Sequence, residues 1–261
     1  RLSIGGQNVK WLTLLLSIRL VSCAHAGEDA SGVRNIYNGD TIVNNIQGHG
    51  RHDPVFKSVV KLNNIKKKTL GTGFIFKNIN NHSYALTAQH LCEHRGATFH
   101  AHAVPDENNV REEFFAKAIY VSDEESDVCI VRIYDTGKQF PELKLSDSAP
   151  RIGDKVMTIG AAVGIFPTKT EGYVIGYDLL GEELEARKDG EGAKMLLASI
   201  PVAGGNSGGP VYNNDFKIVG MLVARHSRYH HSSISVHVET LKIHLKRYFD
   251  RAGPPVIDKK L

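Results

Sequence analysis

Short apolar runs separated by polar turns make up most of the chain from Val55 onward. Runs of this length, bounded by turn residues, are typical of β-strands, and many of them in succession indicate a sandwich or a barrel. Near the end the spacing changes, because Leu241, Leu245 and Phe249 recur every four residues and predict one helix over Val238–Phe249. We therefore expect an all-β domain that ends in a helix. The expected strands are Ser58–Leu62, Gly73–Phe76, Tyr84–Thr87, Phe114–Val121, Val128–Tyr134, Lys155–Ile159, Gly172–Gly176, Met195–Ile200, Pro210–Tyr212 and Ile218–Val223.

The region before this domain has the character of an export signal. Lys10 precedes the apolar run Trp11–Ile18, and small residues follow up to Ala24-His25-Ala26. A charge, a short apolar stretch and an A-x-A site in this order are typical of a secretory signal peptide. The run is shorter than the roughly 20 apolar residues that span a bilayer. We therefore expect residues 1–26 to be a signal-like segment and residues 27–50, rich in Gly, Asn and Asp, to be a polar leader.

Two alternatives to a freely secreted protein stay open. Arg19 interrupts the apolar stretch, so the segment could instead be buried against the domain. The string Leu20-Val21-Ser22-Cys23 resembles a bacterial lipobox, which would make Cys23 a lipidated N-terminus. We expect a secreted protein or one of the periplasm or cell envelope, with membrane contact only if Cys23 is lipidated.

The composition fits one domain with a substantial core. The 261 residues are 41% hydrophobic, and all-β folds of roughly 200–250 residues form single domains. The net charge is +4, from 32 basic and 28 acidic residues, and no basic run is long enough to indicate nucleic-acid binding. Removing a signal at Ala26 would leave Cys92 and Cys129 of the three cysteines, so the apolar core must hold the fold.

Three strings carry candidate chemistry. In Gly204-Gly205-Asn206-Ser207-Gly208-Gly209-Pro210, glycines flank a serine, which lets the backbone turn sharply and aim consecutive N–H groups at one point. Alone, this string would be an unremarkable loop between strands. However, Leu86-Thr87-Ala88-Gln89-His90 places a histidine just after an apolar strand, and Ser126-Asp127 places an aspartate just before another, Val128–Ile133.

Together these strings resemble the LTAAH, D-[IL]-A-L-L and G-[DN]-S-G-G-P signatures of chymotrypsin/trypsin-like serine proteases, in that family's order of His, Asp and Ser. The resemblance extends over about residues 55–250. Gly71–Phe76 is similar to the strand before the family's histidine, and Leu145–Gly160 to the linker and first strand of its second barrel. Ile234–Lys242 resembles the closing strand and helix start of the HtrA/Deg branch.

The resemblance implies two antiparallel six-stranded β-barrels, with the active site between them and a C-terminal helix. It places a peptidase domain at residues 51–252, with barrel 1 at about 51–140, barrel 2 at about 145–250 and a tail at 253–261, without a PDZ domain. His90 and Asp127 would come from barrel 1 and Ser207 from barrel 2, with the N–H groups of Gly205 and Ser207 as oxyanion hole. The implied protein is a serine endopeptidase acting on proteins or peptides, with no cofactor and no metal.

Some positions depart from the digestive members of the family. Asn206 stands where those enzymes have an aspartate that pairs with a new N-terminal amine, so we expect no activation of that kind. Val223 replaces a serine that helps to hold the triad aspartate, which leaves the polar support of Asp127 open. The pocket for the residue before the scissile bond has no acidic residue at its base, so we expect it to accept an apolar side chain. The residues implied to line it are Pro201, Val202, Val223, Ala224, Arg225 and Ser233.

Two other functions stay open. His90-Leu91-Cys92-Glu93-His94 fits H-x-x-E-H, a zinc-metalloprotease pattern, but that pattern needs a helix of several turns, and a β-like string leads in here. A catalytically idle binding or chaperone module would keep the fold and lose activity, although such relatives usually lack a triad residue.

The two remaining cysteines have matching positions. Cys92 lies two residues after His90, and Cys129 lies two residues after Asp127. In a strand, residue i+2 points to the same side as residue i, so Cys129 should face the histidine segment if the triad forms. We expect a Cys92–Cys129 disulfide, and two buried free thiols are the alternative.

Overall fold

The computed structural model describes residues 54–106, 110–137, 139–179, 193–225 and 232–252. The signal-like segment, the polar leader, Cys23 and the tail after the C-terminal helix lie outside these residues. In the part of the chain that is described, no helix is both long enough and apolar enough to cross a membrane.

The first half of the described chain forms a closed antiparallel barrel in the strand order β1-β2-β3-β6-β5-β4. Short connections join most of its neighbouring strands, and β3 pairs with β6 over the whole of β6, from Ala88 opposite Val128 to Ser83 opposite Ile133. The strands are β1 (Val59–Asn64), β2 (Leu70–Ile79), β3 (His82–Ala88), β4 (Thr98–Ala103), β5 (Glu113–Val121) and β6 (Val128–Ile133).

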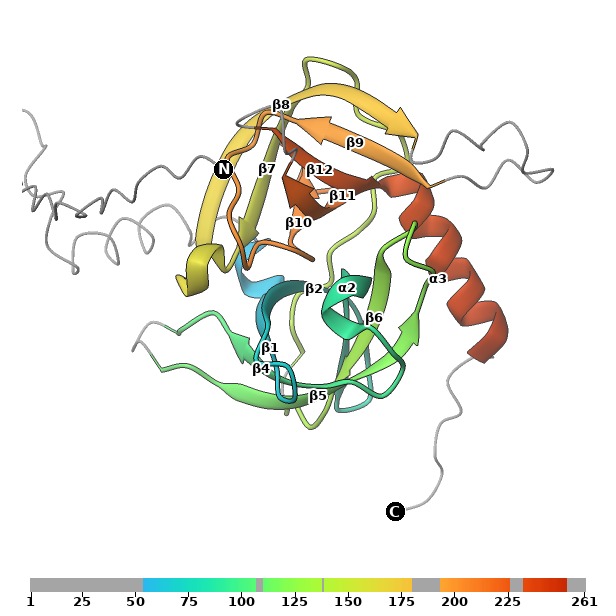
Figure 1. The fold of residues 1–261 in the computed structure, drawn as a ribbon. Coiled ribbons are helices and arrows are strands. Elements are labelled where there is room, and N and C mark those ends of the chain that lie inside the picture. The colour runs from blue at the N-terminus through green and yellow to red at the C-terminus, as the bar shows by residue number, and fades with distance from the viewer. Residues whose placement is uncertain (1–53, 107–109, 138, 180–192, 226–231, 253–261) are drawn as a thin grey trace, which may run out of the picture.

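The second half forms another closed antiparallel barrel, in the order β10-β11-β12-β9-β8-β7. Figure 1 shows the two barrels one above the other, with the first in blue to green and the second in yellow to red. The strands are β7 (Lys155–Gly160), β8 (Thr168–Leu179), β9 (Lys194–Ala198), β10 (Pro210–Tyr212), β11 (Ile218–Arg225) and β12 (Ser233–His237).

Two α-helices accompany the barrels within the described residues. The one-turn helix α2 (Gln89–Cys92) follows β3 directly and lies at the junction of the barrels, while α3 (Val238–Ala252) follows β12 and runs along their side (Figure 1). Leu241 of α3 is fully buried, and its Phe249 meets Phe76 of β2 edge to face at 6.4 Å. A helix that starts at the end of barrel 2 thus packs on barrel 1 as well. Two 3-10 turns, Phe56–Ser58 and Ala162–Gly164, complete the elements.

Each barrel is filled by its own apolar cluster, and a third cluster joins them. Inside barrel 1 lie side chains such as Leu62 and Phe99, and inside barrel 2 Val156 and Leu196. The third cluster contains residues of both barrels, and its members are largely inaccessible to solvent. Burying a large apolar side chain contributes roughly 1.5–3 kcal/mol, so this shared cluster fixes one barrel against the other. Among its members are Phe74, Leu86 and Val128 of barrel 1 and Ile159, Tyr212 and Met221 of barrel 2.

The fold class expected from the sequence is confirmed: two closed six-stranded antiparallel barrels and a C-terminal helix. The predicted strand list, however, lacked β4 and β12, although the resemblance had indicated a closing strand within Ile234–Lys242. In β4 the buried side chains are Phe99, Ala101 and Ala103, and His100 and His102 lie between them, so no apolar run marks the strand. β2 and β8 also run longer than expected, because their added ends contain polar residues such as Lys77 and Asn78 in β2 and Lys169 and Glu171 in β8.

Candidate functional site

The loop that carries Ser207 joins β9 to β10, and its path requires glycine at two positions. Gly205 has φ +98° and Gly208 has φ +83°, in the left-handed region that side chains disfavour. A Cβ on Gly205 would collide with the carbonyl oxygen of Ala161, and one on Gly208 with the carbonyl oxygen of Thr72. The loop can therefore lie directly against the backbone of both barrels, which side chains would prevent.

Thr72 of β2 connects this loop to barrel 1. Its backbone N–H donates to the carbonyl oxygen of Ser207 at 2.8 Å. Its hydroxyl donates to the carbonyl oxygen of Gly205 at 2.7 Å and accepts the N–H of Ala161 at 3.0 Å. Thr72 is fully buried, so these bonds are shielded from water. One threonine of barrel 1 thus fixes the backbone on both sides of the serine loop of barrel 2.

The N–H groups of Gly205 and Ser207 are available to a ligand. The carbonyl oxygen of Gly204 accepts the N–H of Val163 at 2.7 Å. In a trans peptide the C=O and the following N–H point in opposite directions, so the N–H of Gly205 points away from Val163. Neither the Gly205 N–H nor the Ser207 N–H donates to another described residue. Within the described residues neither backbone donor is occupied, which is compatible with the oxyanion hole expected from the sequence.

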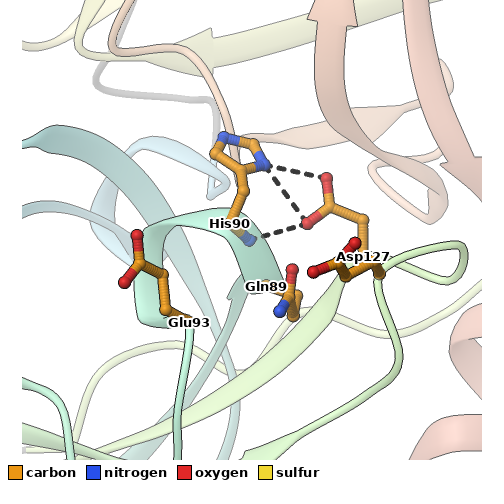
Figure 2. A pocket seen from close by; sticks show the side chains of 5 residues that line it. Gln89, His90, Glu93 and Asp127 are labelled. Carbon is orange, nitrogen blue, oxygen red and sulfur yellow. Dashed lines mark hydrogen bonds and ion pairs between the residues drawn. The ribbon is translucent and has the colours of Figure 1, made fainter.

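His90 and Asp127 form a hydrogen-bonded pair at the mouth of a cleft (Figure 2). Nδ1 of His90 lies 2.9 Å from Oδ2 and 3.2 Å from Oδ1 of Asp127. The backbone N–H of His90 also donates to Oδ1 at 2.9 Å, and the N–H of Gln89 donates to the Asp127 carbonyl at 3.1 Å. The backbone N–H of His90 thus gives the Asp127 carboxylate a polar partner, and the N–H of Gln89 holds its backbone carbonyl.

The loop before Asp127 is itself held by an aspartate. Oδ1 of Asp123 accepts the N–H of Ser126 at 2.8 Å, and the carbonyl of Asp123 accepts the N–H of Asp127 at 3.2 Å. Partial burial of Asp123 by itself would raise the pKa of its carboxyl. The hydrogen bonds from Ser126 outweigh this effect, and the pKa is lower than its ordinary value. Asp123 is therefore charged at neutral pH and closes the turn that leads Asp127 to His90.

Ser207 lies in the same region but makes no hydrogen bond to His90. Its hydroxyl donates to the carbonyl oxygen of Val223 at 3.2 Å. The loop itself sits beside the histidine segment, because a Cβ on Gly208 would lie 3.0 Å from the backbone nitrogen of Ala88, two residues before His90. Side-chain rotamers interconvert readily, and catalytic hydrogen bonds are often long or absent without substrate. The structure thus joins two of the three predicted triad residues directly, and the loop that carries the third packs against the strand that leads to His90.

A polar cavity of about 460 Å³ opens next to the pair. It leaves the His90 side chain 45% exposed, so the imidazole can meet a ligand from solvent. Glu93 of the lining forms an ion pair with Lys67. The lining residues are Gln89, His90, Glu93, Glu124 and Asp127.

The residues implied to line the specificity pocket lie along two strand ends of barrel 2. Arg225 of β11 pairs with Ser233 of β12, and Ala224 pairs with Ile234. Ser233 is fully buried, and its hydroxyl donates to the carbonyl oxygen of Ala198 at 3.2 Å. The Val223 side chain is buried, while Ala224 and Arg225 are exposed. Pro201 and Val202 follow β9, where Val202 packs against the barrel 2 core.

Cys92 and Cys129 form a disulfide with Cα atoms 6.6 Å apart, which is the pairing expected from their positions. Both residues are buried, with 1% and 0% of their surface exposed. The arrangement expected for H-x-x-E-H zinc binding is not present. α2 ends at Cys92, and Glu93 has φ 56°, so His90 and His94 do not share a helix of several turns. No group of three His, Cys, Asp or Glu side chains in the described ranges is placed to hold a metal ion.

Two contributors to this site were missed from the sequence. Thr72 belongs to a string that we compared with the family's strand before the histidine, but nothing local indicated its bonds across the barrels. Val163 holds the Gly204 carbonyl from a loop that carried no motif. Both act through hydrogen bonds between segments far apart in the chain, which strand patterns do not encode.

Comparison with known proteins identifies similar sequences. Residues 71–221 match the family model described as a trypsin-like peptidase domain. A probable periplasmic serine endoprotease, DegP-like, of Pseudomonas fluorescens is 34% identical over 161 residues, which is 59% of this chain and 29% of that protein. The serine protease Do-like HtrA of Bacillus subtilis is 30% identical over 153 residues, 58% of this chain and 32% of that protein. The chain thus spans less than a third of the length of these relatives.

Solved structures show the same fold. The inactive form of the Rv3671c protease superposes with a TM-score of 0.58 at 19% identity, covering 79% of this chain and 94% of that one. The active form of the Rv3671c protease from M. tuberculosis gives a TM-score of 0.60 at 17% identity, covering 85% of this chain and 93% of that one. At this level of identity the likeness concerns the two-barrel architecture.

Proposed function

Because the chain belongs to the trypsin-like peptidase family, whose model matches more than half of its length, we propose that it is a serine endopeptidase acting on protein or peptide substrates. Ser207 is the nucleophile, His90 the general base and acid, and Asp127 the residue that orients and stabilises His90. The observation that carries this proposal is the His90–Asp127 hydrogen-bonded pair, with the Ser207 loop seated against the strand that leads to His90.

The proposed reaction uses the tautomer of His90 that carries its proton on Nδ1, from which it is donated to the Asp127 carboxylate. The short contacts of Nδ1 with both carboxylate oxygens support this assignment. Nε2 is then unprotonated and can accept the proton of the Ser207 hydroxyl. For this transfer the hydroxyl turns from the Val223 carbonyl toward His90. A serine hydroxyl is a weak nucleophile without such a base.

The reaction then proceeds through an acyl-enzyme. Oγ of Ser207 attacks the scissile carbonyl carbon as its proton passes to Nε2, and the negative charge that develops on the carbonyl oxygen is met by the N–H groups of Gly205 and Ser207. The imidazolium, stabilised by Asp127, protonates the leaving amine as the C–N bond breaks. Water, deprotonated by His90, attacks the acyl-enzyme, and the proton returns to Ser207 as the acid is released.

We propose a pocket that accepts an apolar residue before the scissile bond, formed by Pro201, Val202, Val223, Ala224, Arg225 and Ser233. The pairing of β11 with β12 supports this proposal, because it places Ala224 and Arg225 opposite the start of β12. No acidic residue is among these six, so a Lys or Arg side chain would lack a counter-charge there.

We also propose that the peptidase works outside the cytoplasm. Several similar proteins are named periplasmic serine endoproteases. The export-like segment at residues 1–26 supports the same location, and a disulfide such as Cys92–Cys129 persists in an oxidising compartment. Anchoring through a lipid on Cys23 is a further option that mass analysis of the mature N-terminus would detect.

A fluorophosphonate probe tests the nucleophile. The probe should add covalently to one residue, located by peptide mapping as Ser207, and Ser207→Ala should abolish both the adduct and peptide hydrolysis while the melting temperature changes little. Loss of a triad nucleophile typically lowers turnover by ~10⁶. Ser235→Ala is the matched control, because Ser235 is equally a serine of barrel 2, is fully buried, and has an unpartnered hydroxyl.

The alternatives give different results in the same experiment. Labelling that survives chelation by EDTA agrees with the serine mechanism, whereas hydrolysis that EDTA abolishes and Ser207→Ala does not would support the zinc protease. A folded wild-type protein that neither reacts with the probe nor cleaves any peptide, yet suppresses aggregation of an unfolded client, would support the idle binding module.

A further inference from the structure

The helix that carries His90 is too short to be stable by itself. α2 has four residues, whereas isolated helices shorter than about 12–15 residues are marginal in water. Its last residue, Cys92, is followed by Glu93, whose positive φ of 56° ends the helix at once. Tertiary contacts must therefore hold the position of His90.

The segment of Asp127 is equally dependent on its surroundings. Asp127 has φ 48°, and a non-glycine residue in the left-handed region is strained. From Val128 onward the chain enters β6, where Val128 pairs with Ala88 and Cys129 with Thr87 of β3. The hydrogen-bond ladder between β3 and β6 thus fixes the chain that follows Asp127, but it ends at Ala88 and does not include α2.

Beyond the end of the ladder, few bonds connect the two segments. The N–H groups of Gln89 and His90 donate to Asp127. A further bond, from Nδ2 of Asn64 to the carbonyl of Leu91 at 3.0 Å, ties α2 to β1 and not to the Asp127 segment. The Cys92–Cys129 disulfide is the covalent link between the two segments. Each sulfur comes from the second residue after one member of the pair, so the disulfide ties the far end of α2 to the strand that begins at Asp127.

We propose that the Cys92–Cys129 disulfide is a positioning element for the His90–Asp127 pair, which holds α2 in the register where Nδ1 of His90 meets the Asp127 carboxylate. The consequence for catalysis rests on the proposed function of this pair. The disulfide does not touch substrate, and both cysteines are buried, so it acts through the position of α2.

A disulfide that only stabilised the fold would affect catalysis differently from one that positions the pair. Any disulfide restricts the unfolded chain and raises stability wherever it lies, here across 37 residues. A positioning role adds a loss of turnover in molecules that are still folded. A misplacement of about 1 Å can lower a rate about 10²-fold. We expect Cys92→Ala combined with Cys129→Ala to lower kcat roughly 10- to 100-fold, with KM changed less than twofold.

The control is a variant that loses stability elsewhere. Val156→Ala removes a fully buried side chain from the core of barrel 2, away from both segments of the pair. All proteins are assayed well below their melting temperatures, so that each is folded. The control should keep kcat close to wild type even though its melting temperature falls. If the double alanine variant does not fold, it is replaced by Cys92→Ala combined with Cys129→Val, because valine fills more of the volume that the cysteine leaves.

A second measurement does not depend on activity. In protein labelled with ¹⁵N-histidine, the Nδ1–H of His90 should give a downfield proton resonance, assigned by its absence in His90→Ala. This resonance should persist in wild type and Val156→Ala and vanish or shift upfield in the double cysteine variant.

The outcomes separate the positioning role of the disulfide from the proposed peptidase function. If the wild type is inactive toward probe and peptide while the resonance behaves as expected, the proposed function fails and the positioning role stands. If the wild type is active and the double cysteine variant retains both kcat and the resonance, the disulfide is not a positioning element and the proposed function stands. A kcat loss as large in Val156→Ala would equally overturn the positioning role.

Discussion

Thr72 offers a test of how barrel 1 shapes the oxyanion hole that we propose in barrel 2. Thr72→Val keeps the shape of the side chain and removes one hydroxyl, which donates to the Gly205 carbonyl and accepts the Ala161 N–H. Both groups would then be left without that partner in a buried site. An unsatisfied buried donor or acceptor costs about 1–3 kcal/mol, and the valine methyl recovers little of it.

We expect a loss of about 2–3 kcal/mol in the free energy of unfolding, because the Gly205 carbonyl retains a second lone pair. For a domain of this size, that lowers the melting temperature by roughly 4–12 °C. The effect on turnover follows from Gly205, whose N–H is a proposed oxyanion donor. Complete loss of such a donor typically lowers kcat ~10²–10³-fold. Since Thr72→Val displaces rather than removes it, we expect a decrease of at least about tenfold.

Thr158→Val is the matched control for Thr72→Val. Thr158 is a buried threonine in the neighbouring strand β7, and its hydroxyl has no hydrogen-bond partner among the described residues, so the same change removes no bond seen there. Thermal melts and steady-state hydrolysis of a chromogenic peptide compare the two variants. An equal loss of stability in Thr158→Val would refute the hydrogen-bond argument. A Thr72→Val enzyme that melts early but keeps full kcat would refute the link to the oxyanion hole.

Three further predictions concern other parts of the site and the core. Asp127→Asn should lower kcat ~10⁴-fold with little change in the melting temperature, because the amide favours the wrong tautomer of the histidine; near-normal turnover would exclude Asp127 from the triad. Gly208→Ala should abolish fluorophosphonate labelling, whereas Gly204→Ala, where a Cβ meets nothing within 4 Å, should label normally; equal labelling of both would contradict the tight seating of the loop. Acidification should destabilise the fold, because burial lowers the pKa of His244 from its ordinary 6.5 despite the nearby Asp123 charge. Between the lowered pKa of His244 in the folded protein and its ordinary 6.5 in the unfolded chain, the unfolded chain binds more protons. The contribution of His244 to stability is therefore complete above pH 6.5 and is lost as the pH falls toward the pKa of the folded protein. In His244→Asn the melting temperature should depend less steeply on pH between about 7.5 and 5, and an unchanged slope would assign the effect to other groups.

The sequence was most informative where a property depends on neighbours along the chain. Short apolar runs between polar turns marked ten of the twelve strands in the described residues in advance. The four-residue spacing marked α3, because burial of one helix face imposes a period. The Gly204–Gly209 run predicted a sharp turn that depends on glycine. The positive φ angles of Gly205 and Gly208 confirm this prediction. The even spacing of the two cysteines from His90 and Asp127 was enough to predict their pairing, because residues two apart in a strand share a side.

Other features depend on contacts that no local pattern records. β4 was missed because a closed barrel can bury small alanine side chains as effectively as large ones, and these give a weak apolar signal. The one-turn helix α2 exists because packing, hydrogen bonds and a disulfide hold it, since four residues cannot sustain a helix alone.

The bonds of Thr72 and Val163 were decided by the tertiary structure in the same way. The Thr72 hydroxyl meets the carbonyl of Gly205 from 133 positions away, and the Val163 N–H meets the carbonyl of Gly204. Any residue can donate or accept through its backbone, so the partner is determined by which segments the folded barrels bring together. The sequence by itself therefore determined which side chains could carry the chemistry, and the docking of one barrel on the other decided which backbone groups face them.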